Sequence, residues 1–257
     1  MHEIVEIRTH GNPDQPTLVY LPGLHGDWTL VGGFRRELAD RTRFVEMTYP
    51  RTLTWSLDEY AAAIESALAE NGITEGWLLG ESFGSQVLWA LVKRGNFRAK
   101  GIILAGGFVR YPIKLGVLGV ERLASGIPFK LVLPILFAYA RVAKARFGNA
   151  PEMITGVAEF IARRTEEDRK AATHRLRLIA QNDPTSIAKA CDLPVFAFTG
   201  WLDPIVPWVF VRRWLQRNCQ NLKAYEIIRG ADHTVLATSP KKAADLVCAW
   251  MQVASQT

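Results

Sequence analysis

The sequence predicts an α/β fold with a mostly parallel, doubly wound central sheet and an inserted helical cap. Short β-branched and apolar runs alternate with longer segments of helical periodicity, as strands and crossover helices do in parallel sheets. Several of these runs are apolar almost throughout, which is typical of strands buried on both faces. One long segment, residues 109–188, breaks the alternation and contains no convincing strand.

The candidate strands are short, and most lie between turn-forming residues. In chain order they are Ile4–Arg8, Thr17–Leu21, Phe44–Thr48, Gly76–Leu79, Gly101–Leu104, Val195–Thr199 and Lys223–Ile228. Because parallel strands present their carboxyl ends at one edge of the sheet, the loops after these strands are expected to gather there.

Three helices have recognisable starts. The segment Ser56–Glu59 is a capping box, and apolar residues then recur on one face until Asn71-Gly72. A helix is expected from Phe83 to Lys93, directly after the Gly76–Leu79 strand. Ser239-Pro240 begins the last helix, since proline is favoured in a first turn.

The domain organisation follows from the interrupted alternation. Residues 1–108 and 189–257 are predicted to form the core, and residues 109–188 a helical cap broken by several glycines and prolines. The alternative is a pair of ordinary crossover helices with long loops. The stretch from Val109 to Phe147 is rich in apolar residues, which would suit an apolar substrate portion or simply helix packing.

Charge and cysteine usage restrict the class of protein. The formal net charge of +6 is scattered, which gives no sign of a nucleic-acid site, although it permits peripheral contact with an anionic membrane. The chain has three widely spaced cysteines, which argue against a disulfide framework or a zinc site and favour a reducing cytoplasm. No signal peptide and no run long enough to span a bilayer are recognisable, and nothing implies a metal or other cofactor.

The pattern G-x-S-x-G occurs at Gly80-Glu81-Ser82-Phe83-Gly84, between a candidate strand and a candidate helix. In this context the serine occupies a sharp strand-to-helix turn that exposes its hydroxyl at the sheet edge. Ser82 is therefore the candidate nucleophile. The amide of Phe83, at the start of the helix, is one candidate donor to an oxyanion.

A carboxylate and an imidazole follow two later strands. Asp203 comes just after Val195–Thr199, and His233 lies in the loop after Lys223–Ile228. A serine hydroxyl needs a neutral imidazole to take its proton, and a carboxylate to orient that imidazole. The order Ser82, Asp203, His233 provides this set. Asp232 is a rival acid, but a side chain adjacent to His233 would usually point elsewhere.

A glycine-bearing loop follows the strand Thr17–Leu21 and is expected to supply the second oxyanion amide. If Pro22-Gly23 marks the strand end, the donor is the amide of Leu24, which the shorter loop favours. If His25-Gly26 is the equivalent pair, the donor is the amide of Asp27 instead.

The segments PGLHGDW, GESFGS, GWLDPIVP and GADHTVL, in this order, resemble the α/β-hydrolase superfamily, in particular its small cap-bearing members. The resemblance covers most of the core, with Pro22-Gly23 where many members have His-Gly. It implies a serine hydrolase acting on a small-molecule carboxylic ester or thioester. It also makes residues within these segments candidate substrate contacts, namely His25, Trp28, Glu81 and Trp201.

Two other functions fit the same residues. The same triad could serve acyl transfer or the hydrolysis of a carbon–carbon bond. A non-catalytic ligand-binding protein could also keep this fold, although it would have no chemical reason to retain all three groups.

Overall fold

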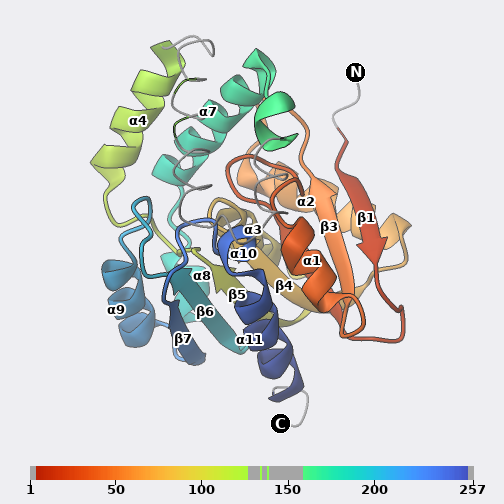
Figure 1. Ribbon diagram of the computed structural model, residues 1–257. Coiled ribbons are helices and arrows are strands. Elements are labelled where there is room, and N and C mark those ends of the chain that lie inside the picture. Colours follow the sequence, from red (N-terminus) through yellow and green to blue (C-terminus); the bar gives the residue numbers. More distant parts are fainter. Residues whose placement is uncertain (1–3, 127–133, 135–137, 139–158, 254–257) are drawn as a thin grey trace.

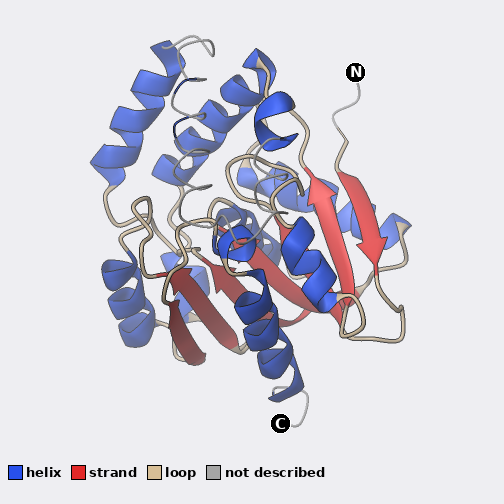
Figure 2. Ribbon diagram, in the orientation of Figure 1, coloured by secondary structure: helices blue, strands red, loops and turns tan. Residues whose placement is uncertain are grey.

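The computed structural model describes residues 4–126, 134, 138 and 159–253. These residues form a seven-stranded sheet in the order β1-β3-β2-β4-β5-β6-β7. The strands are β1 (Glu6–His10), β2 (Thr17–Leu21), β3 (Arg43–Thr48), β4 (Glu75–Glu81), β5 (Arg98–Ala105), β6 (Val195–Gly200) and β7 (Leu222–Ile228). Only β1 runs antiparallel to its neighbour, β3. The predicted mostly parallel sheet is confirmed (Figures 1 and 2).

Helices cover both faces of the sheet, as a doubly wound fold requires. One face carries α1 (Gly32–Leu38), α10 (Val235–Thr238) and α11 (Pro240–Val253). The other carries α2 (Leu57–Glu70), α3 (Gly84–Arg94), α8 (Thr185–Lys189) and α9 (Trp208–Asn218). The side chains of β2 alternate between the two hydrophobic clusters, with Val19 and Leu21 on the α2–α3 side and Leu18 and Tyr20 on the α1–α11 side.

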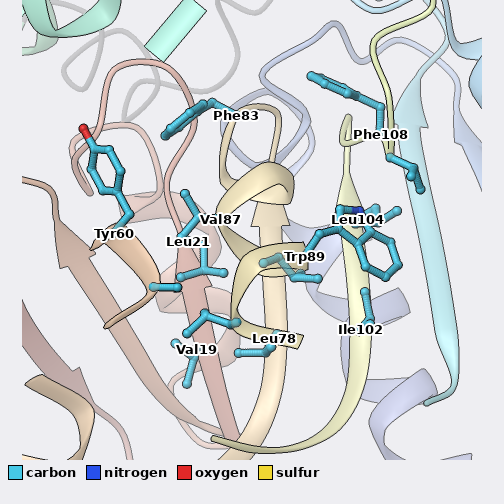
Figure 3. Close-up of a cluster of buried hydrophobic side chains, with 14 of the residues drawn as sticks. Val19, Leu21, Tyr60, Leu78, Phe83, Val87, Trp89, Ile102, Leu104 and Phe108 are labelled. Atoms are coloured by element: carbon cyan, nitrogen blue, oxygen red, sulfur yellow. The ribbon is translucent and has the colours of Figure 1, made fainter. Parts of the chain in front are cut away.

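The cluster on the α2–α3 side supports the turn that carries Ser82. Figure 3 shows Tyr60 of α2 and Val87 of α3 over strand residues that include Leu78 and Ile102. Phe83, at the beginning of α3, is fully buried there and packs edge-on against Tyr60 with ring centroids 5.9 Å apart. The turn between β4 and α3 is therefore fixed by packing on its helical side.

Several boundaries differ from the sequence predictions by one to three residues. Strand β1 begins two residues later than expected, at Glu6, because its register is set by pairing with β3 through His10. Helix α3 begins at Gly84, with Phe83 as its N-cap residue. The expected capping box at Ser56 is present: Ser56 Oγ accepts from the Glu59 amide, and Glu59 Oε2 accepts from the Ser56 amide at 2.7 Å.

Helices α4 (Lys114–Gly126) and α7 (Glu166–Gln181) pack against each other beyond the carboxyl-terminal edge of the sheet (Figure 1). The described residues of segment 109–188 include no strand, and the arrangement suits the predicted cap. Part of the apolar stretch from Val109 to Phe147 lies outside the described residues. The cap as a functional unit stays a prediction.

Among the described residues, no helix has the length and apolar character needed to cross a membrane. Cys191, Cys219 and Cys248 are all buried free thiols.

Candidate active site

The turn that carries Ser82 is strained in the way a nucleophile turn requires. Ser82 has a φ of +48°, and it is the only residue other than glycine with a positive φ in the described part of the chain. A non-glycine residue tolerates this conformation only where its surroundings enforce it. Here the Ser82 amide donates to the Ala105 carbonyl at 3.1 Å, and the Ser82 carbonyl lies 2.6 Å from Ser85 Oγ.

The two glycines of the pattern are required by close backbone approach. A Cβ on Gly84 would lie 2.0 Å from the Leu21 carbonyl oxygen, and one on Gly80 would lie 2.9 Å from the Ser85 backbone. Both distances are far below van der Waals contact, and the obstructing atoms are backbone atoms that cannot turn aside. The glycines thus let α3 pack tightly on β2 and β4 and aim Ser82 at the sheet edge.

Three side chains from different loops meet in series. His233 Nε2 lies 2.9 Å from Ser82 Oγ, and His233 Nδ1 lies 2.8 Å from Asp203 Oδ2. A carboxylate only accepts hydrogen bonds, so Nδ1 carries the proton and Nε2 presents its lone pair to the serine hydroxyl. The structure therefore brings together the three residues that the sequence singled out.

The Asp203 carboxylate is held by the loop that follows it. Its Oδ1 accepts from the Ile205 and Val206 amides at 2.8 and 2.9 Å, and the side chain is fully shielded from solvent. Asp232, the rival acid, instead accepts from the Thr234 amide at 2.9 Å. The carboxylate that faces Nδ1 is thus that of Asp203.

Burial and charge act in opposite directions on the His233 pKa. Removal from water alone would lower it. The hydrogen bond and charge of Asp203, helped by the charges of Glu81 and Asp232, outweigh this effect and raise the pKa above its usual value of 6.5. The imidazolium that forms when His233 accepts a proton is therefore stabilised.

The three candidate oxyanion amides all remain free to donate. Among the described residues, none of the Leu24, Asp27 and Phe83 amides has a protein acceptor, so the choice between Leu24 and Asp27 stays a prediction. Phe83 is fully buried, and buried backbone amides are rarely left unpaired. The close approach of Gly84 to the Leu21 carbonyl brings the start of α3 next to the loop that contains Leu24.

The four expected substrate contacts lie in different surroundings. Trp28 is a core residue with the Arg8 guanidinium 3.9 Å from its ring centroid. Glu81 is buried and accepts from the Tyr20 hydroxyl at 2.5 Å. Trp201 is 57% exposed on the turn after β6. Trp28 and Glu81 therefore have partners within the protein, and a role for Trp28, Glu81 or Trp201 in substrate contact stays a prediction.

His25 lies inside the loop after β2, with its ring edge-on to Phe160 at 5.9 Å between centroids. Burial lowers the His25 pKa and outweighs the charges of Glu81 and Asp27, which act to raise it. Its Nε2 is buried without a hydrogen-bond partner in the described part of the protein. A role for His25 in substrate contact stays a prediction.

Several residues around the site were missed by the sequence analysis. Arg164 and Arg175 bond to carbonyls of the Leu24 loop, and Gln86 of α3 donates to the Phe108 and Val109 carbonyls at 3.0 Å. Asn182, after α7, donates in turn to Gln86 Oε1 at 2.9 Å. These contacts join segments up to about 150 residues apart, and no local pattern indicates them. No cluster of three or more potential metal ligands exists among the residues described.

The comparison with protein families matches the model of the alpha/beta hydrolase family to residues 18–246, nearly the whole chain. The chain belongs to the alpha/beta hydrolase family. The search of curated proteins gave no match.

Solved hydrolase structures share the fold at low sequence identity. An esterase from Thermogutta terrifontis superimposes with a TM-score of 0.76 at 20% identity, covering 97% of this chain and 93% of that one. An alpha/beta hydrolase from a Medee basin deep-sea metagenome gives 0.79 at 14% identity, covering 98% and 95%. An N-acyl homoserine lactonase gives 0.75 at 15% identity, covering 98% and 94%. At identities of 14–20%, these similarities show that this hydrolase shares its fold with the three proteins.

Proposed function

We propose that this hydrolase cleaves a small carboxylic ester or thioester, with an apolar acyl or alcohol portion, through an acyl-serine intermediate. The observation that carries the proposal is the continuous series from Ser82 Oγ through the His233 ring to Asp203, with spacings of 2.9 and 2.8 Å. Both are hydrogen-bond distances suited to proton transfer from the hydroxyl to the imidazole.

The mechanism follows from the donor and acceptor roles. Ser82 Oγ attacks the substrate carbonyl carbon while its proton passes to His233 Nε2, and Asp203 stabilises the resulting imidazolium. The carbonyl oxygen becomes an oxyanion, to which the Leu24 and Phe83 amides donate. His233 then protonates the departing alcohol or thiol. Water, deprotonated by the same imidazole, attacks the acyl-serine, and the free acid and Ser82 are released.

The names of two similar structures support this substrate class. One is an esterase and another is an N-acyl homoserine lactonase, and a lactone is a cyclic ester. Acyl transfer to an acceptor other than water, or cleavage of a carbon–carbon bond, would use the same three side chains. Adding a nucleophilic alcohol or amine to the assay distinguishes transfer from hydrolysis by its product.

Labelling by a fluorophosphonate probe tests the proposal directly. The probe should modify the folded protein stoichiometrically at Ser82, identified by peptide mass spectrometry, and Ser82→Ala should abolish labelling. The same substitution should lower kcat on a p-nitrophenyl ester by about 10⁴-fold or more. A folded wild-type protein that neither reacts with the probe nor hydrolyses esters and acyl thioesters of graded chain length would contradict the proposal and favour a ligand-binding role.

A further inference from the structure

Three consecutive carbonyl groups of the loop after β2 each accept a hydrogen bond. The Gly23 carbonyl accepts from the Gly26 amide at 3.0 Å. The Leu24 carbonyl accepts from Arg175 Nη1 at 2.9 Å, and the His25 carbonyl from Arg164 Nη1 at 3.3 Å. The first bond is local to the loop, whereas the other two come from α7 and the segment just before it.

These bonds determine where the Leu24 amide points. In a trans peptide unit the N–H and C=O groups are coplanar and point in opposite directions. The Gly23 carbonyl, held by Gly26, therefore sets the direction of the Leu24 N–H. Arg175 holds the next peptide plane through the Leu24 carbonyl, so both planes that flank the Leu24 α-carbon are fixed.

Arg175 is built into this place. It is only 2% exposed, and its Nη2 donates to the Pro50 carbonyl at 3.2 Å. A Cβ on Gly26, whose φ is +80°, would lie 2.3 Å from Arg175 Nη1, so only glycine leaves room for the guanidinium. The Arg175 side chain thus connects the middle of α7 to two loop segments, residues 24–26 and residue 50.

The Arg175 guanidinium bonds to backbone carbonyls. Within the described ranges, no acidic side chain forms an ion pair with it, and its Nε has no hydrogen-bond partner. Arg164, by contrast, pairs with Asp27. The Tyr49 ring, whose centroid lies 5.5 Å from Arg175 Cζ, also faces the guanidinium, but burying a charge without a carboxylate partner is costly. A methionine at position 175 would fill a similar volume without the cost of burying a charge. Packing alone therefore does not explain the arginine at this position.

We propose that Arg175 is a positioning residue for catalysis: it holds the Leu24–His25 peptide and so fixes the Leu24 α-carbon, which keeps the Leu24 amide preorganised as an oxyanion donor, with Arg164 supporting the next peptide. The inference rests on the proposed serine mechanism. It implies that the docking of α7 on the core and the completion of the oxyanion hole are one structural event. Removing the guanidinium should therefore weaken transition-state binding more than substrate binding.

The test compares Arg175→Met with Arg177→Met, on the same helix. Arg177 is half-exposed and pairs with Glu121 of α4 at 2.8 Å, so its replacement perturbs α7 without touching the Leu24 loop. Both variants are assayed with an ester after the wild type has been shown to react with a fluorophosphonate at Ser82. Arg175→Met should lower kcat by about 10- to 100-fold with KM within about threefold, because small displacements of an oxyanion donor have effects of this size. Arg177→Met should keep kcat within about threefold.

A second readout separates positioning from general destabilisation. Ser82 Oγ adds to the carbonyl carbon of a trifluoromethyl ketone, and the serine proton passes to His233. The affinity for this inhibitor should fall in parallel with kcat/KM in Arg175→Met. The affinity for the carboxylate product should stay unchanged. Arg175→Lys keeps the charge without the forked geometry and should show an intermediate loss, which provides a variant if Arg175→Met does not fold.

Two results would overturn the inference: equal losses in Arg175→Met and Arg177→Met, or an unchanged ketone affinity in a folded Arg175 variant. Failure of the serine mechanism itself is distinguishable, because the wild type would then not be labelled at Ser82.

Discussion

At the scale of single residues, the chemistry of the site depends on which charges face His233. Asp203 provides both a hydrogen bond to Nδ1 and the largest favourable charge, whereas Asp232 contributes charge alone. Because these effects together outweigh burial, which lowers the His233 pKa, the neutral imidazole is lost on acidification at a pH above the usual histidine value. The pH dependence of activity therefore reports on the local carboxylates.

The pH profile of Asp203→Asn tests this reading. In the wild type, kcat/KM should rise with pH, and its midpoint should lie above 6.5, since the raised pKa keeps the base protonated below that point. In Asp203→Asn burial dominates, the midpoint should move to lower pH, and kcat should fall by about 10⁴-fold. Asp232→Asn should move the midpoint only slightly. An unshifted midpoint in Asp203→Asn would show that another group sets the profile.

The glycines of the nucleophile turn offer a steric prediction. Gly84→Ala should destabilise the protein by about 3 kcal/mol or more, because its Cβ would meet the Leu21 carbonyl and neither backbone can yield easily. Gly119→Ala is the control: nothing lies within 4 Å of its Cβ in α4, and the change should be neutral or stabilise by up to about 1 kcal/mol. Urea denaturation measures both, and a mild effect for Gly84→Ala would contradict the close approach.

At the scale of elements, α7 is both a helix of the predicted cap and a support for the Leu24 loop. Its start is well defined: Thr165 Oγ1 accepts from the Asp168 amide, and Asp168 Oδ2 accepts from the Thr165 amide at 2.9 Å. Three acidic residues in the first turn interact favourably with the positive end of the helix dipole and so stabilise the helix. The helix that carries Arg175 is thus stabilised by its own sequence as well as by packing.

Removing the capping box at Thr165 should destabilise the first turn of α7 locally. Thr165→Ala should cost about 1 kcal/mol and increase amide hydrogen exchange in α7, measured by mass spectrometry. Ser56→Ala removes the equivalent capping box from α2 and serves as the control, with faster exchange in α2 only. Equal exchange of α7 in the wild type and in Thr165→Ala would show that tertiary packing alone holds the helix.

At the scale of the whole molecule, the sheet is held between two hydrophobic clusters that meet different helices. On the α1–α11 side, the Trp250 ring of α11 stacks on Phe196 with centroids 4.9 Å apart and contacts Phe198 at 5.8 Å. Both phenylalanines belong to β6, the strand that leads to Asp203. The last helix therefore anchors a strand that delivers a site residue.

Trp250→Ala should destabilise the whole fold by about 3–5 kcal/mol, because a large buried ring is lost. For a chain of this length, the melting temperature should fall by roughly 6–20 °C. The matched control is Trp201→Ala, since Trp201 is more than half exposed and its loss should change the melting temperature little. Differential scanning calorimetry measures both, and similar melting temperatures for the two variants would contradict the structural role of Trp250.

Local patterns were enough for much of this architecture. Alternating apolar runs located the strands of the parallel sheet, and Ser82, Asp203 and His233 were selected because each follows a strand whose carboxyl end lies at the same edge. A local pattern is sufficient for this because the residues of a short segment determine both its backbone conformation and the face that it buries. Even the choice of Asp203 over Asp232 follows from where adjacent side chains point.

Other features were decided only by the tertiary structure. The antiparallel register of β1, the burial of Trp28 and Glu81 within protein contacts, and the bonds from Arg175 to the Leu24 loop all depend on segments far apart in the chain. The hydrophobic periodicity of a segment shows which of its faces is buried, but not which distant segment packs against that face. These partners are set by the whole fold, so the contacts of the Leu24 loop become visible only when the sheet and α7 have been assembled.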